Sequence, residues 1–77
     1  MRRREQIQVV VAGNGIPTRL CWQGQWVKVE CLINAWVVQG LWWSTEVRRE
    51  YVRLLTAIGA VEIYRQGEHW WFSRTLD

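Results

Sequence analysis

The amino-acid sequence predicts an all-β domain, an antiparallel meander of six or seven short strands that forms a small barrel. Three observations lead to this prediction. Apolar residues alternate with polar ones along several short segments, as in strands with one buried side. Turns that contain glycine separate these segments. The chain is also 49% hydrophobic with a single proline, a composition that is not typical of disordered proteins.

The length of 77 residues is sufficient for one domain. We expect residues 1–5 to form a basic N-terminal tail and residues 6–77 to form the single β domain. A domain of this size buries only about 60% of the surface of its unfolded chain, so each large apolar residue matters. Seven Trp, two Tyr and one Phe supply that bulk.

The first strand is predicted at residues 5–12, which are rich in Val and Ile. Gly13-Asn14-Gly15 is a strong turn signal. Pro17 lacks a backbone N–H, so it fits only the beginning of the next strand or an edge position.

The clearest hairpin joins residues 18–22 to residues 26–33. Its two-residue loop is either Gln23-Gly24 or Gly24-Gln25, and both registers place the apolar residues of the two strands on one side of the sheet. That inner side carries Leu20, Trp22, Val27, Val29, Cys31 and Ile33. The other side carries Trp26, Lys28 and Glu30, and we expect it to face solvent.

The two cysteines, Cys21 and Cys31, are expected to be free thiols, because the hairpin does not place them opposite each other. Cys31 is predicted to act as a small core residue. With one His in the chain, the two cysteines do not supply the four ligands of a structural zinc site. We therefore expect no metal and no other cofactor.

Beyond this hairpin, a bend at Asn34-Ala35 is predicted to lead into another short hairpin at residues 36–43 that turns at Gln39-Gly40. The last hairpin turns at Gln66-Gly67, a loop that pairs Ile63 with Trp70. The residues expected to be buried together are Trp22, Val29, Ile33, Ile63, Trp70 and Phe72.

Residues 45–58 fit two interpretations. Their apolar residues recur at the spacing of a helix, so a sheet with one helix at about 45–57 is the alternative to the meander. In the other interpretation, residues 47–56 are a strand that pairs with residues 60–66. Gly59 then supplies the positive φ that the intervening turn often needs.

The sequence offers little for catalysis. The only Asp is Asp77 and the only His is His69, so no Ser-His-Asp arrangement can be assembled. Carboxylates such as Glu50 and Glu62 alternate with basic residues and are expected to form cross-strand ion pairs. No apolar run is long enough for a signal peptide or a membrane span. We expect a cytoplasmic protein that is not an enzyme.

The aromatic and basic residues suggest a binding surface. Trp26 and Trp71 alternate out of phase with the predicted core, so we expect both to be partly exposed. With Lys28 and an arginine, Arg53 or Arg65, they form the predicted partner-binding surface. Small barrels bind single-stranded nucleic acid with this combination, although packing of the indoles at the barrel rim remains the other explanation. The net charge of +3 lies largely in the N-terminal tail, which favours a protein partner.

Taken together, the motifs resemble a small uncharacterised bacterial domain that sits beside, or is fused to, Y-family polymerase-like proteins of the error-prone mutagenesis cassette. The resemblance covers roughly residues 15–77, and the residues that carry it are Pro17, Trp22-x-Gly24, Val29, Leu32, Trp36, Trp42-Trp43, Arg49-x-Tyr51-x-Arg53, Gly59, Tyr64-Arg65, Trp70 and Arg74-x-Leu76-Asp77. Members of that family often have a strand-like Tyr-Tyr-x-Val where this chain has Tyr51-Val52-Arg53-Leu54, which favours the strand over residues 47–56.

The resemblance implies an accessory interaction module linked to translesion DNA synthesis, with a polymerase-like protein as its partner. It implies no catalytic residues. Weak, sequence-independent binding of single-stranded DNA is the alternative function.

Overall fold

The computed structural model describes residues 5–42 and 45–76, which form six strands and a closed barrel. The strands are β1 (Glu5–Val11), β2 (Pro17–Trp22), β3 (Gln25–Trp42), β4 (Thr45–Thr56), β5 (Gly59–Gln66) and β6 (His69–Leu76). Each strand pairs antiparallel with the next, and β6 pairs with β1 to close the barrel. The predicted all-β meander is therefore confirmed, and the helix at 45–57 is excluded.

Three two-residue turns set the register of the meander. Gln23-Gly24 joins β2 to β3 with positive φ at both residues, as a type I′ turn requires, and Leu20 pairs with Val27. The turn between β4 and β5 lies between Thr56 and Gly59, where Gly59 has a φ of 116°. This confirms the predicted hairpin of residues 47–56 with residues 60–66.

The turn of the last hairpin lies one residue later than predicted. Gln66 pairs with His69, so Gly67 occupies the first turn position with a φ of 64°, where a type II′ turn places glycine. Ile63 therefore pairs with Phe72 instead of Trp70. Because the register moves by two residues, the same side chains still point inward.

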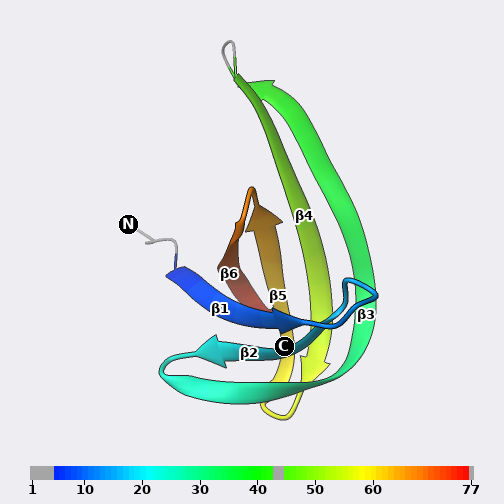
Figure 1. Cartoon of the computed structure of the whole chain (residues 1–77), viewed down its shortest axis with the longest axis vertical. Coiled ribbons are helices and arrows are strands. Elements are labelled where there is room, and N and C mark those ends of the chain that lie inside the picture. The colour runs from blue at the N-terminus through cyan, green and yellow to red at the C-terminus, as the bar shows by residue number, and fades with distance from the viewer. Residues whose placement is uncertain (1–4, 43–44, 77) are drawn as a thin grey trace.

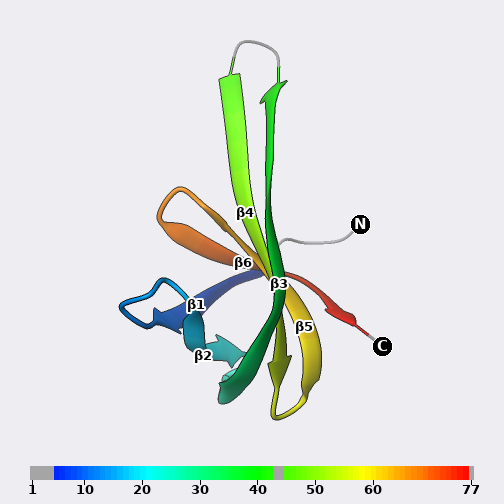
Figure 2. The ribbon, with the colours of Figure 1, turned by 90° about the vertical axis from the view of Figure 1, so that its right-hand side faces the viewer.

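β3 and β4 form the longest element of the fold. Both strands extend past the barrel as a two-stranded ribbon (Figures 1 and 2). The predicted separate hairpin at residues 36–43 is wrong, because β3 continues through Gln39-Gly40 to Trp42. Gly40 does not adopt the positive φ that a tight hairpin turn needs. The last residue of that predicted hairpin, Trp43, lies outside the described residues.

Two β-bulges curve β3 where a bend was predicted. The register shifts between Val29 and Cys31 and again between Leu32 and Asn34, so Glu30 and Ile33 are the additional residues. Each bulge reverses which side of the strand a following residue faces. Ile33 is consequently 51% exposed and Cys31 is exposed, so their predicted places in the core are wrong.

The core lies inside the barrel and is assembled from five of the six strands. Its largest fully buried side chains are Leu20, Leu54, Val61 and Ile63. Each stabilises the fold by about 1.5–3 kcal/mol relative to an exposed position. Partly buried residues pack around them, namely Val9, Trp22, Val29, Val52, Trp70 and Phe72.

Of the six residues predicted to be buried together, Ile63 is buried, and Trp22, Val29, Trp70 and Phe72 are half-buried against the core. Trp22 and Phe72 stack with ring centroids 4.7 Å apart. These two rings pack against the buried core from one side and remain partly exposed.

Candidate binding surface

Trp26 is 54% exposed, which makes it the most exposed of the tryptophans whose burial the structure describes. Trp26 pairs with Cys21, and two residues later Lys28 pairs with Arg19. Leu20 and Val27, between these pairs, point into the core, so the alternation along the strands directs the other four outward. We call this surface the Trp26 face. Its outward residues on β1, β2 and β3 are Gln8, Val10, Arg19, Cys21, Trp26 and Lys28.

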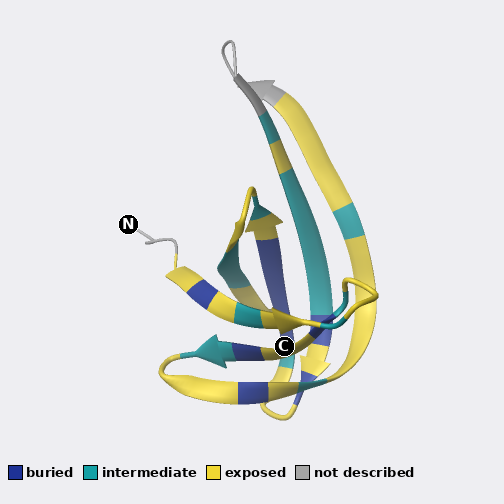
Figure 3. Cartoon of the chain, viewed as in Figure 1, coloured by how far each residue is buried: buried dark blue, intermediate teal, exposed yellow. Residues whose placement is uncertain are grey.

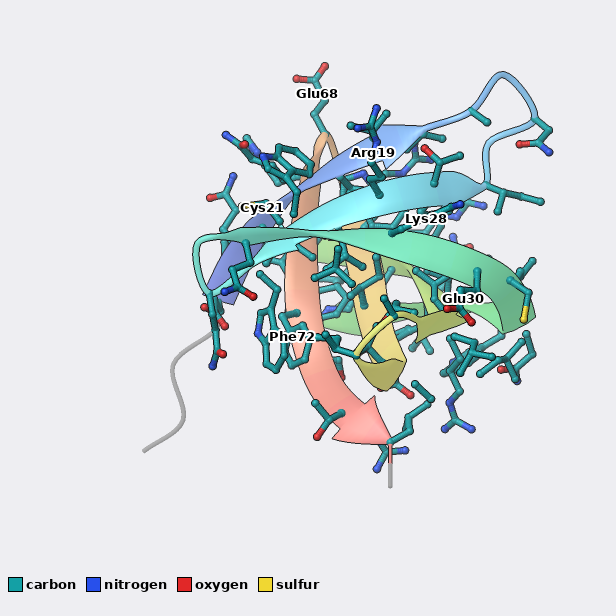
Figure 4. All side chains as sticks on the ribbon, turned by 90° about the horizontal axis from the view of Figure 1, so that it is seen from below. Arg19, Cys21, Lys28, Glu30, Glu68 and Phe72 are labelled. Atoms are coloured by element: carbon teal, nitrogen blue, oxygen red, sulfur yellow. The ribbon has the colours of Figure 1, made fainter. Side chains whose placement is uncertain are left out.

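The two cations of the Trp26 face have no anionic partner. Among the described residues, the side chains of Arg19 and Lys28 take part in no hydrogen bond, ion pair or ring contact. Figure 4 shows both side chains on the outer side of β2 and β3, whereas Phe72 lies on the inner side. Lys28 follows Trp26 by two residues, about 7 Å along the strand, and Arg19 is the diagonal neighbour of Trp26 on β2, about 7–8 Å away and within reach of long side chains. The exposed indole therefore has two uncompensated positive charges close to it.

A second outward surface lies across β3, β4, β5 and β6, and the register aligns four aromatic residues along it. Trp36 pairs with Tyr51, Tyr51 with Tyr64, and Tyr64 with Trp71. We call these four residues the aromatic row. The rings of Trp36 and Tyr51 are stacked 5.3 Å apart, and those of Tyr51 and Tyr64 are 5.0 Å apart. The rings of Trp36, Tyr51 and Tyr64 are thus engaged in contacts within the fold.

Arginines beside the aromatic row are also engaged within the fold. The guanidinium of Arg49 lies 4.9 Å from the ring centroid of Tyr64, and its Nε donates to Gln66. The guanidinium of Arg53 lies 4.9 Å from the ring centroid of Trp36. Such cation–π contacts stabilise the surface by about 0.5–1 kcal/mol each where solvent is close.

Glu62 is the anionic centre of this second surface. Its side chain is 7% exposed, and its carboxylate accepts hydrogen bonds from Arg53 Nε at 3.0 Å and from Ser73 Oγ at 2.7 Å. Arg74 Nε lies 3.7 Å from the same carboxylate. Burial by itself raises the pKa of Glu62, but the two hydrogen bonds and the charges of Arg74 and Arg53 outweigh it and lower the pKa below its ordinary value.

Arg65 lies on the other side of the sheet from Trp71. It pairs with Trp70 across β6, and its guanidinium lies 6.0 Å from the Trp70 ring centroid. Its Nε donates to Glu50 at 2.9 Å, and its terminal nitrogen also contacts that carboxylate. The expected cross-strand ion pairs are thus confirmed for Glu50 and Glu62.

The structure divides the five predicted partner-binding residues into three places. Trp26 and Lys28 lie together on the Trp26 face, Arg53 and Trp71 lie on the second surface, and Arg65 lies at the inner side. Trp26 is exposed and Trp71 is half-buried, so the predicted partial exposure of both is confirmed. A single surface made of all five is not formed, because Arg65 points to the opposite side of the sheet from Arg53 and Trp71, while Trp26 and Lys28 lie on β3 beside β2.

The residue that the predicted binding set omitted is Arg19. Its position opposite Lys28 follows from the Gln23-Gly24 turn, which fixes the pairing of β2 with β3. The sequence alone does not decide between the two possible turns, so it does not determine which residue pairs with Arg19.

Two of the open pockets formed by the described residues have volumes of about 410 and 390 Å³. The first is lined by residues of the β2–β3 and β4–β5 turns, such as Gln23 and Ile58. The second lies at the base of the ribbon, and its charged residues, Glu50 and Arg65, neutralise each other. Neither pocket presents an unpaired acid or base.

Other features bear on cofactors and membranes. Cys21 and Cys31 are free thiols, as predicted. No group of three or more potential metal ligands occurs within residues 5–42 and 45–76. No helix capable of crossing a membrane is found in that same part of the chain.

Comparison with models of protein families, with curated proteins and with solved structures gives no match to this chain. The resemblance drawn from the sequence motifs therefore rests on those motifs alone.

Proposed function

We propose that this chain is a non-enzymatic binding module whose ligand-binding surface is the Trp26 face, and that its ligand is single-stranded DNA. The observation that carries the proposal is the combination of an exposed indole with two unpaired cations. An indole offers a flat surface on which any base can stack, and cations beside it attract the phosphates. The motifs resemble a domain associated with translesion polymerases, and this resemblance also supports a ligand that occurs in DNA synthesis.

The arrangement supports weak and sequence-independent binding. Two cations neutralise at most two phosphates, and stacking on one indole contributes about 1–3 kcal/mol per base.

The test is a titration with oligothymidine that follows the intrinsic Trp fluorescence. We expect quenching, and an affinity that falls with salt at a slope of about −1.4 in log K against log [salt], because each neutralised phosphate contributes about −0.7 on a single strand. Trp26→Ala is expected to weaken binding by about 5- to 150-fold, the range that one stacked base implies.

A matched control distinguishes DNA binding at the Trp26 face from a general effect of positive charge on the protein. Arg48→Ala removes one positive charge from a side chain that is 58% exposed and lies on the ribbon, so it should leave the affinity nearly unchanged. Lys28→Ala should weaken binding and reduce the salt slope by about 0.7. Equal losses in Arg48→Ala and Lys28→Ala would contradict a localised site.

A polymerase-like protein is the second candidate partner for the same face. Val10, which belongs to this face, and the adjacent Val11 are each 41% exposed, and exposed apolar residues around an aromatic anchor suit a protein interface. In that case oligothymidine should not bind at physiological salt. A Trp26→Ala variant should then keep its fold but lose capture of a Y-family polymerase-like protein.

A further inference from the structure

The pocket of about 410 Å³ lies at the end of the barrel where two of the hairpins turn. Its walls come from the β2–β3 turn, the β4–β5 turn and the last residues of β6. Figure 3 shows both turns exposed at the lower end of the barrel. Pockets that bind small molecules have volumes of about 300–1,000 Å³. We call this space the turn pocket, and its volume is sufficient for a ligand of the size of a nucleoside.

The turn pocket combines an aromatic ring with apolar walls. Trp22 and Val27 line it from the β2–β3 hairpin, and Ile58 and Leu76 line it from the β4–β5 turn and from β6. Trp22 stacks on Phe72, and among the described residues no second ring stacks on it. A flat ligand can therefore stack on the indole on the side away from Phe72. Because Ile58 is 51% exposed, such a ligand would also remove apolar surface from water.

Three polar side chains without hydrogen-bond partners complete the turn pocket. Gln23, Gln25 and Thr75 line it, and their side chains form no hydrogen bond with any described residue. Gln25 pairs with Trp22, so the Cβ atoms of the two residues lie about 4.5–5.5 Å apart. The amide of Gln25 is therefore within reach of a ligand that stacks on the indole. No described residue that lines the pocket carries a charge, which favours an uncharged ligand, because a buried charge would lack a counter-charge.

We propose that the turn pocket binds an adenine base, which stacks on Trp22 and is recognised at its edge by Gln25. A glutamine amide presents a donor and an acceptor side by side. Adenine presents the complementary pair, with its N6 amino group as donor and N7 as acceptor, and glutamine is a common partner for this edge. Gln23 and Thr75 supply further hydrogen-bonding groups for the attached sugar. The base is uncharged, in agreement with the lining of the pocket.

Two sources of the adenine base are compatible with this site, namely a free nucleoside and a DNA strand bound to the Trp26 face. Gln25 and Trp26 are consecutive residues of β3, so they point to opposite sides of the sheet. A strand that stacks one base on Trp26 can continue around the Gln23-Gly24 turn and place another base in the turn pocket. Stacking on an indole accepts any base, so a preference for adenine would come from the turn pocket. Only this second source rests on the proposed function.

The first test titrates the whole isotope-labelled chain with adenosine and follows its NMR spectrum. We expect the indole N–H of Trp22 and the side-chain amide of Gln25 to shift, with a dissociation constant of about 0.1–1 mM for so open a pocket. Inosine is the matched ligand, because it has the same size but carries an oxygen in place of the N6 amino group. Inosine should bind about 5- to 150-fold more weakly, the range that one bidentate contact implies.

Two variants of the whole chain test the role of the amide. Gln25→Leu keeps a side chain of similar size at an exposed position, so it should fold, weaken adenosine binding and abolish the preference over inosine. Gln66→Leu alters a glutamine at the far end of β5, away from the turn pocket, and should leave the binding of both nucleosides unchanged. Trp26→Ala should also bind adenosine as the wild type does, whichever source supplies the base.

The second test distinguishes the two sources with oligodeoxyadenosine and oligothymidine of equal length. If a strand supplies the base, the wild type should bind oligodeoxyadenosine more tightly, and Gln25→Leu should remove that preference. If a free nucleoside supplies it, the two oligonucleotides should not differ. Loss of DNA binding with adenosine binding retained would refute the proposed function alone. The adenine site is overturned by the absence of adenosine binding up to about 5 mM, well above the expected constant, by equal binding of inosine, or by a Gln25→Leu variant that binds adenosine like the wild type.

Discussion

Replacement of Glu62 by Gln tests how the buried carboxylate stabilises the barrel. Glutamine keeps the shape of the side chain and its ability to accept from Arg53, but it removes the negative charge between two arginines. Hydrogen bonds to charged groups contribute about 1.5–3 kcal/mol each, and those to neutral groups about 0.5–1.5. Because the side chain of Arg53 is 33% exposed and that of Arg74 is 56% exposed, solvent reduces the loss. We expect Glu62→Gln to lower the free energy of unfolding by about 1–2 kcal/mol at pH 7.

The pKa of Glu62 determines how the loss of stability in Glu62→Gln should change with pH. The pKa of Glu62 in the folded chain lies below its ordinary value of 4.5. The charged carboxylate therefore contributes its full stabilisation above pH 4.5, and this contribution is lost as the pH falls through the folded pKa. The difference in stability between the wild type and Glu62→Gln should be largest at neutral pH and should shrink in acid below pH 4.5.

The assay is guanidinium chloride unfolding followed by Trp fluorescence at pH 7 and at about pH 3. Other carboxylates titrate in both proteins, so their contribution cancels in the difference. A difference that stays constant between the two pH values would show that the loss comes from altered packing and would refute the electrostatic reasoning. Glu50→Gln serves as a control, because its side chain is 36% exposed and a smaller loss is expected.

The remaining predictions concern the core and one turn. Ile63→Ala should lower the free energy of unfolding by about 2–5 kcal/mol, the usual range for a fully buried aliphatic residue. Ile33→Ala should change it by less than about 1 kcal/mol, because the bulge exposes that side chain. Urea unfolding compares the two variants, and equal losses of stability would contradict the bulge at Ile33. Gly59→Ala should destabilise by about 1–2 kcal/mol because of its positive φ. Gly13→Ala, which also meets no neighbouring atom and has no positive φ, should be nearly neutral in the same urea unfolding assay.

Much of the fold could be predicted from turns and alternation. Gly24 and Gly59 are the glycines of their turns, with φ values of 77° and 116°, and the chemistry of such turns identifies both hairpins from the sequence. Alternation correctly placed Leu20 and Ile63 inside and Trp26 outside. These features depend on neighbouring residues, so a local pattern is sufficient to find them.

The bulges of β3 could not be predicted in the same way. Glu30 and Ile33 are ordinary strand residues with no glycine beside them, and they become additional residues only because β3 must curve around the barrel and then leave it. The prediction that Ile33 is buried failed for this reason. The ion pair of Arg53 with Glu62 could not be predicted either, because it depends on the exact register of β4 with β5. Without that register, Arg53 was predicted to lie on the binding surface.

The contact between β1 and β6 has a consequence for the order of folding. Five of the six strand pairs join strands that are consecutive in the chain, whereas this one brings Glu5 beside Phe72. Closing a loop of that length costs more chain entropy than forming a short hairpin, and a barrel cannot gain from the closure until the hairpins between exist. The hairpins should thus form within microseconds, and joining β1 to β6 should set the overall folding rate. During synthesis on the ribosome, this last step must wait until residues 70–72 have emerged, so β1 remains without its second neighbour until β6 has been made.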